Sequence, residues 1–401
     1  MSLRVLTALS GALVAVFLAQ LGAPHARSTV DRAPLSQLMR RPGPVPDYAP
    51  MAAVWTHPQL MTIGAALPGA LDEILHDRHQ VDDYNPPKAE GDYVEGQVED
   101  EQDGTLVWLR DYQPIYVRDK QGHLKALRYL AENPNRAAYL PIELPLSEPF
   151  YSDKLVDPNQ AARVEALPLL HENGNLVVAG RFVFLTDLII EDNTEDHTEA
   201  HLEEAGFHPM SRPQIIETLA RALERRPQDI IILPRMPGEL TGHVDLFLMA
   251  LDDSTVVVPE IHPKAIEHAG LLVDADLAHA VRRFLDAQAN RMHRLGLRVI
   301  RLPMVPPLLL PPVDDEPDWD FVFYSPANGL LLRNENDAVA VLPGADLSEV
   351  APLMAPLQRR YEAEWKKALA SAGWKVRIVD ATRLGRFLGL FRCVSAVVPA
   401  E

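Results

Sequence analysis

The sequence predicts an α/β fold assembled from similar modules around a common axis. A hairpin–helix–strand pattern is visible three times, and a distinctive polar residue stands at the start of each hairpin. Five such polar positions follow one another at roughly equal steps, which indicates five modules. Ordinary α/β alternation would instead place single parallel strands between the helices.

The three visible repeats run in the same order. Apolar hairpins over 174–187, 242–260 and 328–344 alternate as paired strands do. Each is followed by a stretch with apolar residues at three-to-four spacing, which predicts helices over 212–226, 276–296 and 353–373. A short apolar strand then closes each repeat, over 229–234, 297–303 and 374–380.

The composition is that of a globular protein with an acidic surface. The 401 residues are 47% hydrophobic, and 38 basic against 56 acidic residues give a formal net charge of −18. Such a charge disfavours nucleic acid and anionic membranes as partners, because both are polyanions. A cationic small molecule or an arginine-containing peptide is compatible with it. Oligomeric state has no signature in the sequence.

Residues 1–27 read as a secretory signal peptide. Arg4 precedes an apolar run from Val5 to Leu21, and small residues follow near Ala23 and Ala26. An uncleaved membrane anchor is the alternative, but Ser10, Gly11 and Gln20 interrupt the run. We therefore expect a signal peptide over 1–27, a tail over 28–45 and one domain over 46–401, in a periplasmic or secreted protein with no membrane contact after cleavage.

The five polar positions are separated by 61, 71, 85 and 65 residues, and each stands near the mouth of a predicted strand. They are Asp111, Glu172, His243, Asn328 and Cys393, with Asp245 two residues after the histidine. Equivalent positions of modules around an axis converge at its centre. A thiol, an imidazole and carboxylates would then meet although they are far apart in the chain.

The residue types in this set indicate attack on a guanidinium carbon. A thiol is nucleophilic only as thiolate, and a nearby histidine is its usual activator. Asp111, Glu172 and Asp245 could hold a planar guanidinium through forked, charge-assisted hydrogen bonds. The bound cation would favour the thiolate beside it. Each residue also has an ordinary structural explanation, since free cysteines are commonly just buried.

The segments "WLRDYQP", "ENGN" and "TGHVDLF", the strand at Asn328 and a cysteine on a late strand occur in this order. The chain in this respect resembles agmatine deiminases and bacterial peptidylarginine deiminases, over roughly residues 46–399. These belong to the guanidino-group-modifying superfamily. The resemblance implies its pentein fold, a five-bladed ββαβ propeller with fivefold pseudosymmetry.

The resemblance also implies roles for these residues. Cys393 would be the nucleophile that forms a covalent amidino-thioether, and His243 would protonate the departing ammonia and then activate water. Asp111 and Asp245 would bind the guanidinium nitrogens. The residues expected to line or brace the substrate site are Asn328, Glu172, Trp108 and Arg110. This chemistry implies no metal and no organic cofactor.

One segment departs from the family pattern. A glycine-rich turn and a histidine usually precede the cysteine, whereas "LGLFRC" places Phe391 and Arg392 there. The sequence therefore leaves open agmatine, arginine or peptidylarginine as substrate. It also leaves open another chemistry of the superfamily, amidino transfer or dimethylarginine hydrolysis, and an inactive protein that only binds guanidino compounds. We expect the irregular stretches 82–104 and 304–320 to set specificity.

Overall fold

The structure is a computed structural model that describes most of the chain after residue 40. The described ranges are 41–56, 66–75, 81–83, 108–130, 163–195, residue 202, 207–310, 321–334, 337–387 and 389–400. The predicted signal peptide, most of the predicted tail and most of the two predicted specificity stretches lie outside them. Within these ranges no helix combines the length and the apolar character needed to cross a bilayer.

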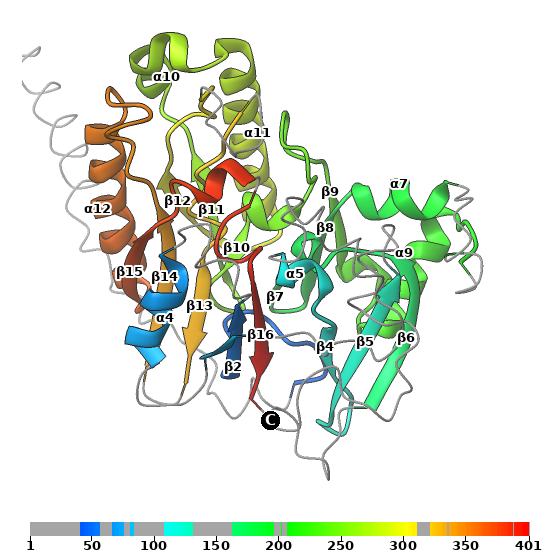
Figure 1. The fold of residues 1–401 in the computed structure, drawn as a ribbon. Helices are drawn as coiled ribbons and strands as arrows, with labels where there is room; N and C mark the ends of the chain where they lie inside the picture. The colour runs from blue at the N-terminus through cyan, green and yellow to red at the C-terminus, as the bar shows by residue number, and fades with distance from the viewer. Residues whose placement is uncertain are drawn as a thin grey trace, which may run out of the picture. The chain divides into compact units, whose positions relative to one another are not determined.

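The described strands form five sheets that share one pairing pattern (Figure 1). In every sheet the first strand of the module pairs antiparallel with the second, and the second pairs parallel with the third. In strand order, the sheets are β4 (Ile115–Arg118), β5 (Leu124–Leu130) and β6 (Arg163–Leu170); β7 (Val177–Ala179), β8 (Phe182–Thr186) and β9 (Ile230–Leu233); β10 (Met249–Ala250), β11 (Thr255–Glu260) and β12 (Arg298–Pro303); β13 (Leu330–Arg333), β14 (Ala338–Gly344) and β15 (Lys375–Asp380); and β16 (Ser395–Pro399), β2 (Met51–Thr56) and β3 (Val81–Asp83). The short β1 (Gly43–Pro44) adds to the outer side of β4.

Helices connect the second and third strands of four of these sheets, as a parallel pair requires a crossover connection. They are α4 (Leu67–Leu75) after β2, α7 (Leu188–Thr194) and α9 (Arg212–Ala222) after β8, α10 (Pro263–Ala269) and α11 (Ala275–Arg294) after β11, and α12 (Ala355–Ser371) after β14. One further short helix, α5 (Leu109–Tyr112), directly precedes β4.

The module from β10 to β12 shows how the local sequence produces this pattern. The Asp274 carboxylate accepts a hydrogen bond from the Leu277 backbone N–H at 3.0 Å, which caps the first turn of α11. The buried face of α11 includes Val281 and Leu285, and Gly296, at φ +84°, allows the chain to leave the helix. The chain then returns as β12, parallel to β11.

The sheet that contains β16 is built from both ends of the described chain. Ser395 pairs with Thr56 and Val397 with Val54 in an antiparallel register. Figure 1 shows β16, in red, beside β2, in blue. The first strand of this module thus comes from the C-terminal region, and its remaining two strands come from the N-terminal region.

These observations confirm the predicted α/β class and the three visible repeats. The structure adds two modules, one from β4 to β6 and one that joins the chain ends. Apolar side chains between the sheets and their helices form the core, for example Val117, Leu185 and Leu219, all fully buried. The closed arrangement of the modules about an axis stays a prediction.

Candidate active site

The predicted polar residues stand directly before the first strands of the five modules. Asp111 lies in α5 ahead of β4, Glu172 precedes a 3₁₀ turn ahead of β7, and His243 precedes a 3₁₀ turn ahead of β10. One residue, Gly329, separates Asn328 from β13, and Cys393 precedes β16. The structure brings them together in two contacting groups.

The first group is an imidazole held between two carboxylates. Nε2 of His243 lies 2.8 Å from the Glu172 carboxylate, and Nδ1 lies 3.7 Å from Oδ1 of Asp111. Burial by itself lowers the pKa of His243, but the charge of Asp111, and then of Glu172 and Asp245, outweighs burial and raises the pKa to about 10. His243 is therefore an imidazolium at neutral pH, with both ring nitrogens acting as donors.

Gly174 makes this close approach possible. A Cβ at this position would come within 2.4 Å of Nδ1 of His243 and 2.8 Å of Oδ1 of Asp111. Without one, the Gly174 backbone N–H can donate a hydrogen bond to Oδ1 of Asp111 at 3.2 Å. The glycine of "ENGN" is thus required by the packing of the site.

The second group surrounds the thiol. Cys393 is 4% exposed, and Nδ2 of Asn328 donates to its Sγ at 3.2 Å. Oδ1 of the same amide accepts a hydrogen bond from the Arg392 backbone N–H at 3.1 Å, so Asn328 holds two consecutive residues. Burial raises the pKa of the Cys393 thiol well above its usual value, and the charges of Asp245 and Asp111 raise it further. The thiol is therefore protonated at neutral pH.

Asp245 links the thiol to a buried arginine. The carboxylate is fully buried, and its Oδ2 accepts a hydrogen bond from Nη1 of Arg392 at 2.5 Å. Nη2 of Arg392 donates to Oδ2 of Asp47 at 2.8 Å. Burial lowers the pKa of Arg392, but Asp47 and Asp245 outweigh burial and raise it. Arg392 thus meets carboxylates on both sides.

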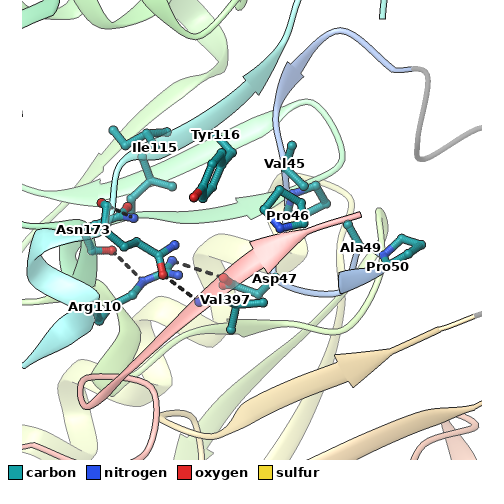
Figure 2. Close-up of a pocket in the computed structure, with 13 residues that line it drawn as sticks. Val45, Pro46, Asp47, Ala49, Pro50, Arg110, Ile115, Tyr116, Asn173 and Val397 are labelled. Carbon is teal, nitrogen blue, oxygen red and sulfur yellow. Dashed lines mark hydrogen bonds and ion pairs between the residues drawn. The ribbon is translucent and has the colours of Figure 1, made fainter. Parts of the chain in front are cut away.

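Arg110 and Trp108 were predicted to bind substrate, and the structure shows their contacts. The Arg110 guanidinium lies 3.1 Å from Oδ1 of Asp47 and donates to the Asn173 carbonyl oxygen, beside a cavity lined also by Tyr116 and Val397 (Figure 2). Trp108 is half-buried, and a Cβ at Gly389 would lie 2.2 Å from its ring. Their role in binding substrate stays a prediction.

One cluster of the described residues has the spacing of a metal site. Ligand atoms of Asp111, Glu172 and His243 lie within 4.8 Å of one another. The ring nitrogens of His243 face Glu172 and Asp111, and these contacts account for the close approach of the three side chains.

Sequence reasoning missed Asp47. It pairs with two buried arginines, Arg110 and Arg392, although it lies in a short proline-rich segment near the start of the described chain. Burial alone would raise the pKa of Asp47, but the two arginines outweigh burial and lower it. An acidic residue between apolar residues and prolines was the available signal, because a buried carboxylate needs a cationic partner.

Comparison with solved structures shows the same fold in agmatine deiminases. The chain matches the C. jejuni agmatine deiminase with a TM-score of 0.57 at 13% identity, covering 90% of this chain and 97% of that one. A variant of that enzyme with substrate bound matches with a TM-score of 0.56 at 14% identity, over 90% and 97% of the two chains. The agmatine deiminase of Enterococcus faecalis matches with a TM-score of 0.54 at 14% identity, over 92% and 98%.

No protein-family model matches the chain, and no curated protein matches it. At these identities the likeness defines the fold. Fold and site together describe an α/β protein of the agmatine deiminase architecture, with a buried thiol, an imidazolium and several carboxylates at the starts of its modules.

Proposed function

We propose that this protein is a guanidine deiminase. It hydrolyses a C–N bond of a guanidino group, releases ammonia and leaves the ureido product, through a covalent intermediate on Cys393. The observation that carries this proposal is the group of a buried thiol, an imidazolium and carboxylates, in which Oδ1 of Asp245 is buried with no hydrogen-bond partner among the described residues. The fold shared with agmatine deiminases supports it.

The described site is rich in carboxylates. Asp47, Asp111, Glu172 and Asp245 are paired there with Arg110, Arg392 and protonated His243. His171 adds no charge, because burial, and then the charge of His243, lowers its pKa to about 3. Carboxylates placed in this way suit a guanidinium ion, which is cationic and planar.

Asp245 offers a specific place for that cation. Its Oδ1 is buried and has no hydrogen-bond partner among the described residues. An unpaired buried carboxylate oxygen is costly, and a guanidinium N–H would satisfy it. Asp111 would take a second nitrogen of the same planar group.

The chemistry then follows from the two pKa shifts. The bound cation lowers the pKa of Cys393 by balancing the nearby carboxylates, so the thiol releases its proton to solvent and the thiolate forms when substrate is present. Sγ attacks the guanidino carbon, His243 gives its proton to a departing nitrogen, and the C–N bond breaks with loss of ammonia. Neutral His243 then takes a proton from water, whose oxygen attacks the amidino-thioether carbon. The C–S bond breaks, the remaining hydroxyl proton passes to the released thiolate, and the ureido product leaves.

The finer parts of the proposal concern substrate and location. Agmatine, arginine and arginine in a peptide all carry the required cation, and the apolar start of the chain supports an exported protein, in which an arginine-containing peptide is a reachable substrate. The closed propeller, with the modules about an axis, is part of the same proposal, supported by the five sheets of equal pairing.

The test is an activity assay with purified protein. Agmatine, arginine and an arginine-containing peptide are each incubated with wild type and with Cys393→Ala, while ammonia and ureido product are measured. We expect turnover of at least one compound by wild type alone, and a mass increase of Cys393 when the reaction is quenched early. Equal turnover by both proteins would reject Cys393 as nucleophile.

A second candidate is a protein that binds guanidino compounds without turnover. The observation in its favour is Arg392, which already occupies one oxygen of Asp245. Agmatine binding measured by calorimetry, with no ammonia from any of the three compounds, would select this candidate.

A further inference from the structure

Arg392 stands directly before the proposed nucleophile, where the family resemblance implied a histidine, and the structure shows where its charge lies. Arg392 is 4% exposed, and its guanidinium donates to two carboxylates and two backbone carbonyls. The contacts are Nη1 to Asp245 Oδ2 at 2.5 Å, Nη1 to Gly174 O at 3.5 Å, Nη2 to Leu176 O at 2.7 Å, Nη2 to Asp47 Oδ2 at 2.8 Å and Nε to Asp47 Oδ2 at 3.1 Å. The side chain is therefore held in a single place.

The contacts of Asp245 are unequal. Oδ2 is bonded to Arg392, whereas Oδ1 is buried with no hydrogen-bond partner among the described residues. A buried carboxylate that could rotate freely would turn both oxygens toward donors, because a buried oxygen without a hydrogen bond costs free energy. The ion pair with Arg392 fixes one oxygen and so determines which way the other one faces.

Asp47 fixes Arg392 in turn. It pairs with Arg392 and also with Arg110, whose backbone N–H donates to the Cys393 carbonyl oxygen at 3.0 Å. The segment around Asp47 therefore reaches the chain on both sides of the thiol, and Figure 2 shows Asp47 facing Arg110 beside the cavity that both residues line. Two arginines and two aspartates alternate in this network, so each buried charge has a partner.

We propose that Arg392 is a positioning residue for Asp245: it binds Oδ2 so that Oδ1 is presented to the guanidino group, and Asp47 is the counter-ion that holds Arg392 in place. This inference deepens the proposed function and rests on it. Arg392 makes no contact with the substrate itself. Its cation also balances part of the Asp245 charge beside Cys393.

The experiment measures protection of Cys393 from iodoacetamide by agmatine, in full-length protein at pH 8. The variants are Arg392→Met, Arg392→Lys and Asp47→Asn, with Arg301→Met as control. Arg301 pairs with Asp286 between α11 and β12, away from the site. Folding is checked for each variant by its thermal unfolding transition.

Removing the cation should weaken protection strongly. For Arg392→Met we expect the agmatine concentration that gives half protection to rise about 10- to 100-fold. The reason is that Oδ1 of Asp245 would no longer be held in place to accept a charge-assisted hydrogen bond from agmatine. Arg392→Lys should recover part of the loss, because an ammonium keeps the charge without the fork. Asp47→Asn should give a smaller rise and Arg301→Met none. Equal half-protecting concentrations in Arg392→Met and Arg301→Met would overturn the proposal.

A second readout separates this proposal from the proposed function. The rate of alkylation without agmatine should fall about fivefold in Arg392→Met, because the uncompensated Asp245 charge disfavours the thiolate. This rate requires no substrate. If agmatine neither protects nor turns over in wild type, the proposed function fails, and an unchanged alkylation rate in Arg392→Met would overturn the Arg392–Asp245 coupling as well. If Arg392→Met does not fold, Arg392→Lys and Asp47→Asn carry both readouts.

Discussion

In the two contacting groups of the site, carboxylates have opposite effects on the charged form of the central residue. Around His243, the carboxylates of Asp111 and Glu172 stabilise the charged imidazolium. Around Cys393, burial first, and then the carboxylates of Asp245 and Asp111, disfavour the charged thiolate. Both groups are thus kept protonated, one as a cation and the other as a neutral thiol.

Under the proposed mechanism the two groups therefore differ in what substrate changes. His243 already carries the proton for the leaving group, whereas the thiolate of Cys393 forms when a cation lies beside it. We expect substrate binding to lower the pKa of Cys393 and to leave His243 protonated. The lone thiol would then react only with a guanidinium bound beside it.

The largest expected effect comes from replacing His243, the proposed acid. His243→Gln should lower kcat on the best guanidino substrate by about 10²- to 10⁴-fold, because the proton donor to the leaving nitrogen is lost. The alkylation rate of Cys393 should change much less. Steady-state kinetics and iodoacetamide labelling measure the two effects, with exposed His293→Gln as control. Equal losses in kcat and in the alkylation rate would contradict a role for His243 that is separate from that of Cys393.

The pH dependence of stability tests the charge on His243. Its pKa is about 10 in the folded protein and near 6.5 when unfolded, so its contribution is full below pH 6.5 and is lost as pH rises toward 10. The free energy of unfolding should fall from this group by on the order of 3 kcal/mol over this window. Urea unfolding at pH 6.5, 8 and 9.5 measures it, and His243→Gln should show a flatter profile. Identical slopes would place the pKa of His243 near its ordinary value.

Removing the charge of Asp245 should change agmatine binding and the reactivity of Cys393 in opposite directions. Asp245→Asn should weaken agmatine protection by about 10- to 100-fold, through loss of a charge-assisted hydrogen bond. It should also speed alkylation of Cys393 without substrate, because a charge that raises the pKa of the thiol is gone. Exposed Asp276→Asn in α11 is the matched control. Slower alkylation in Asp245→Asn would reverse the assigned sign.

The smallest effect belongs to the hydrogen bond on the thiol. The Asn328 amide lowers the pKa of Cys393, and this contribution is small beside burial. Asn328→Ala should therefore slow alkylation only a fewfold, about 1 kcal/mol of thiolate stabilisation. Exposed Asn290→Ala is the control. If Asn328→Ala lowered kcat as much as His243→Gln does, Asn328 would have a role beyond its hydrogen bond to the thiol.

The sequence predicted the modules well because their signals are local. Apolar alternation in 242–260 and helical spacing in 276–296 each concern neighbours within a few residues, and both correspond to observed elements, β10, β11 and α11. The polar positions were recognisable because each interrupts an apolar stretch at the start of a strand. The pairing of β16 with β2 had no such signal, since its partners lie at opposite ends of the chain.

The α/β class, the repeated modules and the residue types at their starts follow from the sequence alone. The contacts of Arg392 with Asp245 and Asp47, the latter 345 residues away in sequence, depend on the folded chain. A buried charge must be balanced by whichever opposite charge the fold brings within reach, and local periodicity carries no information about that partner. The same contact with Arg392 makes the two oxygens of Asp245 unequal, since Oδ2 is bonded and Oδ1 has no hydrogen-bond partner among the described residues.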